Sequence, residues 1–296
     1  MKKISRRNFL LASGVVTVGA ALAACGGSGA STPAASGAAS TSTAASVAAA
    51  GEDKFASLGD FTMTVGHAQP EGNPRFVSME QFAADVAEAT NGHVKIEVYG
   101  NGQLGTEKEM LEQVVAGTVQ GMRGGQFDFS PRLLMFTLPF LTNTRAQVTA
   151  LLQSDLAQKV CAEAEGETGT VIINLCDAGG YRQFSNSKHP IKAPADLKGL
   201  KMRTNGMKTI DMTFQAMGAT TTTIPYSDLY MGLKTGVADG QENPWVNVEG
   251  MKFYEVQKYF TEVNYQFHPD PFYVNAAWWN GLPEESIREK VRETYV

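Results

Sequence analysis

From Phe61 onward the chain alternates short strand patterns with helical ones, and this alternation constrains the fold more than any other feature. The segments 61–66 and 93–99 are typical of strands, the second because apolar and polar residues alternate along it. Between them, Asn73 and Pro74 form a helix start, and apolar residues follow at helical spacing. Repeated alternation of this kind predicts an α/β fold.

A sequence pattern that occurs twice in the chain favours two lobes. The segments 115–121 and 234–240 both read as a helix end, a glycine stop and a return into a strand. About 240 residues is large for one α/β core but comfortable for two. We expect two lobes with a ligand cleft between them, at the strand ends. The expected boundaries are lobe I at 56–179, lobe II at 180–267, and a return to lobe I at 268–296.

The C-terminal segment predicts one more helix. It begins near Leu282-Pro283, with acidic residues in the first turn, and Ile287, Val291 and Tyr295 continue an apolar stripe. The helix stops without a cap, and the stripe has no obvious cover in the sequence. We therefore expect that the last C-terminal elements are missing.

The first 25 residues have the layout of an export signal. A basic start without acidic residues precedes an apolar run from Phe9 to Ala24. The run is shorter than the roughly 20 residues that a membrane-spanning helix needs, so cleavage is favoured over a permanent anchor. Residues 5–10, Ser-Arg-Arg-Asn-Phe-Leu, resemble the twin-arginine export signature. General secretion is the alternative route.

The signal ends in a segment that resembles a bacterial lipobox, Leu22-Ala-Ala-Cys25-Gly26, in which Cys25 is the lipid acceptor. An ordinary cleavage site beside an incidental cysteine is the alternative. Residues 26–50 contain only Gly, Ser, Ala, Thr, Pro and Val. Such a segment cannot bury enough surface to offset its ordering entropy. We expect a flexible tether over 26–55 and a membrane-anchored lipoprotein in the periplasm or at the cell surface.

Charge and cysteine content narrow the class further. The chain has 25 basic and 30 acidic residues, and four of the basic ones lie in the export signal. This acidic balance argues against nucleic acid or an anionic membrane surface as a partner. Cys161 falls on a helical pattern and Cys176 in an apolar run. Two buried thiols are therefore favoured over a disulfide.

The sequence gives little support for a catalytic site or a metal site. Gly100-Asn-Gly-Gln-Leu-Gly105 matches a dinucleotide-binding pattern, so an exported oxidoreductase is the alternative function. The preceding strand carries polar Lys95 and Glu97 and is not the first strand, and both features count against that site. The four histidines are scattered, without metal-binding spacing. We expect a binding protein, not an enzyme, with no cofactor and no metal.

Three segments resemble the solute-binding proteins of tripartite ATP-independent periplasmic (TRAP) transporters: 180–191, 196–203 and 237–244. Shorter matches support them at 103–105, 138–141, 225–230 and 254–259. The resemblance covers nearly everything from residue 60 to the end. It implies a two-lobed, periplasmic-binding-protein-like α/β fold that closes over a small carboxylate, such as an organic acid, a sugar acid or a dicarboxylate.

The resemblance also implies a set of ligand-binding residues. Arg203 matches the arginine that pairs with the ligand carboxylate, and the planar, always charged guanidinium suits this role. Arg182 matches the earlier family arginine, and Asn243 the asparagine of the Q-E-N-P motif. Asn243 precedes a proline, so stabilisation of a turn is the alternative role. Tyr226 falls on the aromatic wall, where family members also carry Phe.

The remaining expectations concern the pocket mouth and the partners. His67, Asn73 and Glu107 occupy loops where the family shapes the mouth, although Asn73 and Glu107 also lie at helix starts. Trp245 departs from the small aliphatic residue common in the family and leaves pocket size open. The expected partners are the small and large TRAP membrane subunits and the membrane itself through Cys25. We expect a monomer.

Overall fold

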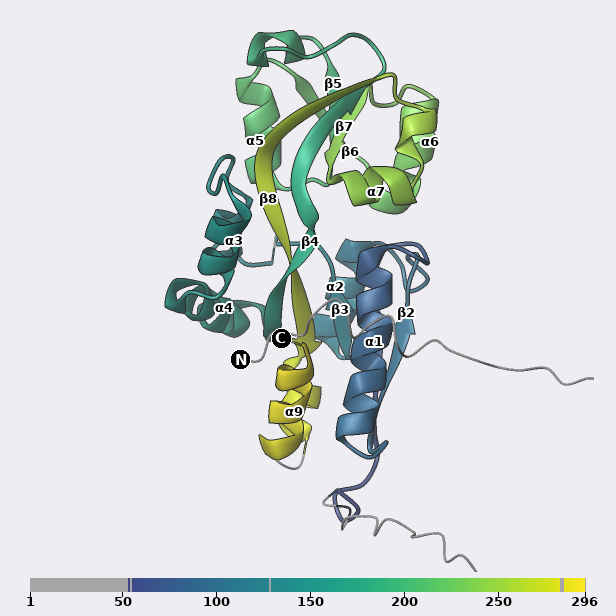
Figure 1. Ribbon diagram of the computed structural model, residues 1–296, viewed down its shortest axis with the longest axis vertical. Helices are drawn as coiled ribbons and strands as arrows, with labels where there is room; N and C mark the ends of the chain where they lie inside the picture. The colour runs from purple at the N-terminus through teal and green to yellow at the C-terminus, as the bar shows by residue number, and fades with distance from the viewer. Residues whose placement is uncertain (1–52, 54, 128, 283–284, 296) are drawn as a thin grey trace, which may run out of the picture. The chain divides into compact units, whose positions relative to one another are not determined.

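The computed structural model describes residues 53, 55–127, 129–282 and 285–295 (Figure 1). The export signal, Cys25 and nearly all of the expected tether lie outside the described residues. The described chain is a mixed α/β structure.

Among the described residues, eight strands form one sheet in the order β2-β1-β3-β8-β4-β7-β5-β6. The strands are β1 Phe61–Gly66, β2 Val94–Tyr99, β3 Gly121–Arg123, β4 Thr170–Asn186, β5 Lys201–Thr204, β6 Thr220–Thr223, β7 Gly240–Asn243 and β8 Tyr259–Asn275. The long strands β4 and β8 pair antiparallel and run through both halves of the sheet (Figure 1). We call the half with β1–β3 lobe I and the half with β5–β7 lobe II. The expected two-lobed α/β fold is confirmed.

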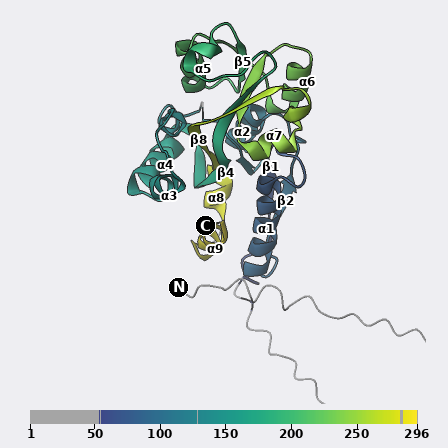
Figure 2. The same ribbon diagram turned by 45° about the horizontal axis from the view of Figure 1, so that its top comes forward.

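Helices surround each half of this sheet. They are α1 Pro74–Ala89, α2 Glu107–Ala116, α3 Arg145–Leu152, α4 Asp155–Thr168, α5 Lys208–Ala216, α6 Leu229–Lys234, α7 Trp245–Gly250, α8 Ala276–Gly281 and α9 Glu285–Tyr295. Helices α5, α6 and α7 lie around lobe II, and the other helices lie with lobe I (Figures 1 and 2).

Local sequence signals account for the helix ends. Asn73 Oδ1 accepts the second backbone N–H of α1 at 2.9 Å. At α2, the Thr106 hydroxyl accepts the Glu109 N–H, and the Glu109 carboxylate accepts the Thr106 N–H, so the predicted capping box is present. After α2 and α6, Gly117 and Gly236 have φ angles of 80° and 77° and turn the chain toward β3 and β7. The pattern shared by the segments 115–121 and 234–240 is therefore a repeated helix–strand turn.

A bend in β4 lies between the lobes. Its register with β8 shifts between Asp177 and Tyr181, where Gly179 and Gly180 have φ angles of 111° and 104°. Residues with a Cβ rarely adopt such angles. Asp177 Oδ1 accepts both glycine N–H groups, at 2.8 and 2.7 Å, and so fixes the bend. Because β4 and β8 cross from one lobe to the other, the expected residue boundaries of the lobes stay a prediction.

The stripe of α9 is covered, so the expectation that it has no cover is wrong. Ile287 and Val291 are fully buried in one apolar cluster with Met79, Val86 and Phe272. Helix α9 lies along α1, which supplies two of these residues (Figure 1). The sequence could not reveal this contact because the two helices are nearly two hundred residues apart.

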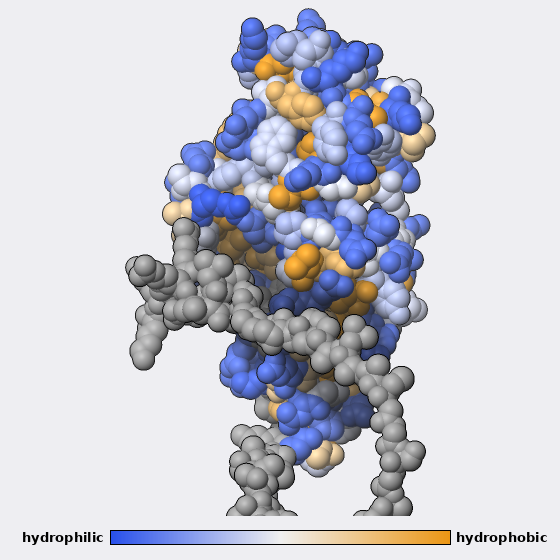
Figure 3. Space-filling model, turned by 45° about the vertical axis from the view of Figure 1, so that its right-hand side comes forward, coloured by the Kyte–Doolittle hydropathy of each residue, from blue (hydrophilic) through white to orange (hydrophobic). Residues whose placement is uncertain are grey.

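On the face shown in Figure 3, hydrophilic residues predominate and apolar ones are scattered. Within the described ranges, no helix combines the length and apolar character needed to cross a membrane. Cys161 and Cys176 are both half-buried and form no disulfide with each other.

Candidate functional site

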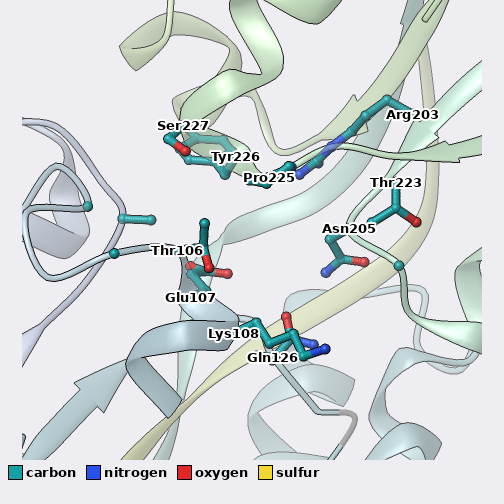
Figure 4. Close-up of a pocket in the computed structure, with 14 residues that line it drawn as sticks. Thr106, Glu107, Lys108, Gln126, Arg203, Asn205, Thr223, Pro225, Tyr226 and Ser227 are labelled. Carbon is teal, nitrogen blue, oxygen red and sulfur yellow. The ribbon is translucent and has the colours of Figure 1, made fainter. Parts of the chain in front are cut away.

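Two adjoining cavities lie between the lobes. The outer cavity has a volume of about 320 Å³, near the lower end of the range for small-molecule sites, roughly 300–1,000 Å³. Figure 4 shows its lining from lobe I (Thr106, Glu107, Lys108 and Gln126) and from lobe II (Arg203, Asn205, Thr223, Pro225, Tyr226 and Ser227). The inner cavity has about 30 Å³ and shares Glu107, Arg203, Asn205 and Tyr226 with the outer one. It is also lined by Gln69, Arg75, Gly125, Arg182, Asn243, Asn247, His268 and Asp270.

Arg203 is a buried cation that forms no ion pair with any residue the structure describes. It lies in β5, is 2% exposed, and lines both cavities. Its Nε donates to the Ile224 carbonyl at 2.8 Å. No carboxylate of the described residues forms an ion pair with it, and no described residue accepts from its terminal nitrogens. Burial lowers the pKa of Arg203 to about 10, so it stays charged at neutral pH. An uncompensated buried charge of this kind favours an anion in the cavity.

Arg182, in contrast, has its counterion within the protein. Its Nη2 donates to Glu242 Oε1 at 2.8 Å, and its Nε pairs with the other carboxylate oxygen. Tyr265 donates its hydroxyl to the same carboxylate at 2.7 Å. Burial alone would lower the pKa of Arg182, but the ion pair with Glu242 raises it above the ordinary value. The charge of Arg182 is therefore neutralised before any ligand enters.

Asn243 connects this pair to the cavity wall. It ends β7, and its Oδ1 accepts from Arg182 Nη2 at 3.1 Å. Its Nδ2 donates to Gln241 Oε1 at 2.6 Å, and Asn247 donates to its Oδ1 at 3.4 Å. These bonds fix the orientation of the amide where it lines the inner cavity.

A second network joins lobe I to β8. Arg75, near the start of α1, donates through Nη1 to Glu107 Oε1 at 2.9 Å and through Nη2 to Asp270 Oδ1 at 2.7 Å. Burial opposes the charge of Arg75, but Asp270 and Glu107 raise its pKa above the ordinary value. Glu107 is thus held in place at the first residue of α2, where it faces both cavities.

Tyr226 forms one wall and links the lobes. Its hydroxyl donates to Gln69 Oε1 of lobe I at 3.0 Å and lies 3.3 Å from the Asn247 carbonyl. Its ring lies along the outer cavity beside Pro225 and packs edge-on against Phe253, with ring centroids 6.0 Å apart (Figure 4). Burial raises the pKa of the phenol, so the hydroxyl stays neutral.

Two expected residues lie away from the cavities. His67 is fully buried, packs edge-on against Phe76, and lines neither cavity. Asn73 caps α1 and reaches Asn247 Oδ1 at 3.5 Å, but it too lines neither cavity. Trp245 is 40% exposed at the start of α7 and is absent from both linings, so it does not set the pocket size.

The sequence reasoning missed the partners of the buried arginines. Glu242 stands inside the Q-E-N-P motif, so its neighbour Asn243 could have pointed to it. Arg75 carried a weaker signal, a cation in the first turns of an otherwise amphipathic helix. Asp270 carried none, because its pair with Arg75 joins residues 195 positions apart.

The glycine-rich segment has a structural role. A Cβ on Gly100 would lie 2.3 Å from the Phe76 ring, so close packing requires glycine there. Gly102 and Gly105 lie in the loop before α2. The N–H groups of Thr106 and Glu109 at this helix start already bond to side chains of the capping box, which leaves fewer free for a pyrophosphate. Within the described ranges, no group of His, Cys, Asp or Glu could hold a metal ion.

Comparison with known proteins identifies the family. Residues 65–295 match the family described as bacterial extracellular solute-binding protein, family 7, and residues 3–23 match the twin-arginine translocation signal. The 2,3-diketo-L-gulonate-binding periplasmic protein of Escherichia coli is 30% identical over 233 residues, which are 78% of this chain and 70% of the relative. A protein of Sinorhizobium fredii is 36% identical over 71% of this chain, which spans only 39% of that relative's length.

A solved structure supports the same family assignment. A TRAP periplasmic solute-binding protein from Desulfovibrio salexigens, with bound orotic acid, has 32% identity and a TM-score of 0.75 over 79% of this chain and 75% of its own. These matches give the oxidoreductase alternative no support, and the matched signal supports export to the periplasm. The chain therefore belongs to family 7 of the bacterial extracellular solute-binding proteins, and it is a TRAP-type solute-binding protein, not an enzyme.

Proposed function

We propose that the protein captures a small organic carboxylate in the cavities between its lobes and delivers it to the membrane subunits of a TRAP transporter. The observation that carries this proposal is Arg203, a buried guanidinium whose terminal nitrogens face the cavities without a partner among the described residues. A carboxylate is the planar anion that fits this fork. The names of the relatives agree, since they mention 2,3-diketo-L-gulonate and orotic acid, both organic acids.

In this proposal the candidate residues have different roles. Arg203 pairs with the ligand carboxylate, Tyr226 covers the ligand, and Glu107 contacts its far end. Arg182 acts through Glu242 and Asn243, which it orients, because its own charge is already neutralised. His67 and Asn73 support the mouth from behind, through the packing against Phe76 and the cap of α1.

A screen with matched neutral ligands tests the function. Protein freed of ligand by unfolding and refolding is melted with organic acids and with the primary amides of the same acids. A ligand at 100 times its dissociation constant adds about 2.7 kcal/mol of stability, which raises the melting temperature measurably. We expect at least one acid to stabilise the protein while its amide does not. Equal stabilisation by acid and amide would refute carboxylate recognition.

We further propose that the exported protein is a monomer held by a lipid on Cys25 and a tether over residues 26–55. The lipobox-like segment and the uncharged composition that follows it support this anchor. The Cys25→Ser variant should leave the membrane fraction and appear in the soluble periplasmic fraction of the producing cells. Full retention in the membrane fraction would contradict the anchor without affecting ligand binding.

A further inference from the structure

The wall opposite Arg203 carries the carboxylate of Glu107. Glu107 lines both cavities and is 17% exposed. Its Oε1 accepts from Arg75, but no described residue donates to its Oε2. In Figure 4, Glu107 and Arg203 enter the outer cavity from opposite walls. A ligand that bridges them therefore meets a cation at one end and a carboxylate at the other.

His268 adds an acceptor in the inner cavity. Its ring is 1% exposed, and its Nε2 lies 3.1 Å from the Gly125 carbonyl. A carbonyl oxygen only accepts, so Nε2 carries the proton and Nδ1 is the acceptor. Nδ1 is buried and has no hydrogen-bond partner within the described part of the chain. The ring lines the inner cavity together with Glu107.

The nearby buried cations already have carboxylates beside them, although the Nε atoms of Arg75 and Arg123 have no hydrogen-bond partner in the described part of the chain. Arg75 bonds to both Glu107 and Asp270. Arg123 lies 3.7 Å from Asp270, but it donates to Ser78 and to the Asp177 carbonyl and lines a groove behind the site, not either cavity. A second ligand carboxylate, which can only accept, would therefore face Glu107 without a buried cation of its own.

We propose that the preferred ligand is a carboxylate that carries hydroxyl groups, which donate to Glu107, and that a dicarboxylate of the same length binds more weakly. This inference rests on the proposed carboxylate function and names the ligand class within it. A hydroxyl group can donate to Glu107 Oε2 or His268 Nδ1, whereas a second carboxylate leaves these buried acceptors unsatisfied and adds repulsion.

Lys108 is the feature that could favour a dicarboxylate. It lines the outer cavity beside Gln126, but it is exposed, so water and salt screen its charge (Figure 4). The half-buried Glu107 carboxylate is screened less than the exposed Lys108 ammonium, and we expect Glu107 to decide the selectivity.

Calorimetric titration of the full chain, freed of ligand, with two sets of acids tests the inference. The four-carbon set is D-erythronate, succinate and butyrate, and the six-carbon set is D-gluconate, adipate and hexanoate. In at least one set we expect the hydroxylated acid to bind 10-fold or more tightly than the dicarboxylate of the same length. Dicarboxylates that bind as tightly as the hydroxylated acids, or more tightly, in every set that binds would overturn the inference and leave the proposed function intact. Failure of all six acids, and of a wider organic-acid screen, would refute the proposed function itself.

Variants of Glu107 distinguish a role in ligand selectivity from a purely structural role. In Glu107→Gln, we expect hydroxylated acids to lose about 10-fold in affinity while dicarboxylates are unchanged or gain, because the repulsion is removed. Glu112→Gln makes the same charge change at an exposed site on α2, outside both linings, and should change neither affinity. Equal losses for both ligand classes in Glu107→Gln would mean that Glu107 is only structural. Tight succinate or adipate binding that disappears in Lys108→Gln would identify Lys108 as a second anchor and overturn the inference.

Discussion

Replacement of Arg203 by methionine should stabilise the ligand-free protein while it abolishes binding. Burial lowers the pKa of Arg203 from 12.5 to about 10, which corresponds to a cost of about 3 kcal/mol for holding the charged form in the folded protein. Methionine removes that charge and keeps most of the volume. It also removes the hydrogen bond to the Ile224 carbonyl, worth about 1 kcal/mol. The expected net gain is about 2 kcal/mol in the free energy of unfolding.

Arg182→Met is the matched control, because this arginine is equally buried but paired. Its removal leaves Glu242 buried without an ion-pair partner among the described residues, and with the Tyr265 hydroxyl as the side-chain donor that still bonds to its carboxylate. Breaking a buried ion pair by deleting one partner costs about 3–5 kcal/mol. The two variants should therefore shift stability in opposite directions, although both remove one buried guanidinium.

Urea unfolding of the three ligand-free proteins measures these shifts, and titration with the acid found by the screen measures binding. A hydrogen bond to a charged group is worth about 1.5–3 kcal/mol, so loss of a two-pronged contact should weaken binding by about 100-fold or more. Arg203→Lys should recover only part of the affinity, because an ammonium lacks the planar fork. If Arg203→Met lowers the urea midpoint as far as Arg182→Met, or binds with wild-type affinity, the reasoning about the unpaired cation is wrong.

Three further predictions follow from single contacts and pKa shifts. Tyr226→Phe removes the hydroxyl that joins the lobes, so stopped-flow measurements should show ligand dissociation about 5-fold faster, as expected for about 1 kcal/mol, with little change in association. Burial lowers the pKa of His67 to about 3 and that of His268 well below its ordinary value, so below pH 6.5 the unfolded chain gains protons that the folded protein does not. His67 should reduce stability by about 2 kcal/mol between pH 6.5 and pH 5, and His268 should act in the same direction, so His67→Gln or His268→Gln should flatten the urea midpoint against pH. His93 opposes this trend, since Asp53 and Asp60 raise its pKa and stabilise its charged form as the pH falls. Burial raises the pKa of Cys161 to about 12, so its alkylation at pH 8 should be far slower in the folded protein than in urea.

Features that depend on neighbouring residues could be predicted from the sequence. The bounds of β1, the Asn73 cap and the Thr106–Glu109 capping box follow from the residues within a few positions of each. The short-range signal is sufficient because the partner groups are fixed by local backbone geometry.

The site itself depends on long-range contacts, and there the sequence alone was less informative. The resemblance brought Arg203, Tyr226 and Glu107 forward, and all three line the outer cavity. The resemblance also suggested His67. This side chain packs against Phe76 behind the site, because the first strand leads into buried aromatic packing away from the cavity. Which arginine is paired could not be predicted, because the carboxylate partners come from distant strands.

The contrast among the buried arginines explains how ligand binding can be coupled to the closed arrangement of the lobes. Arg75 and Arg182 have carboxylate partners that are present without ligand, so their pairing costs nothing extra when the lobes meet. Arg203 belongs to lobe II, and the contact of Tyr226 with Gln69 of lobe I lies over the same cavity. Without an anion, bringing the lobes together leaves the Arg203 charge desolvated, whereas a bound carboxylate supplies the missing counterion. In the proposed function a bound carboxylate therefore favours the closed arrangement by at most the cost of the unpaired cation, and a shift of about 3 kcal/mol would change the ratio of closed to open molecules by about 100-fold.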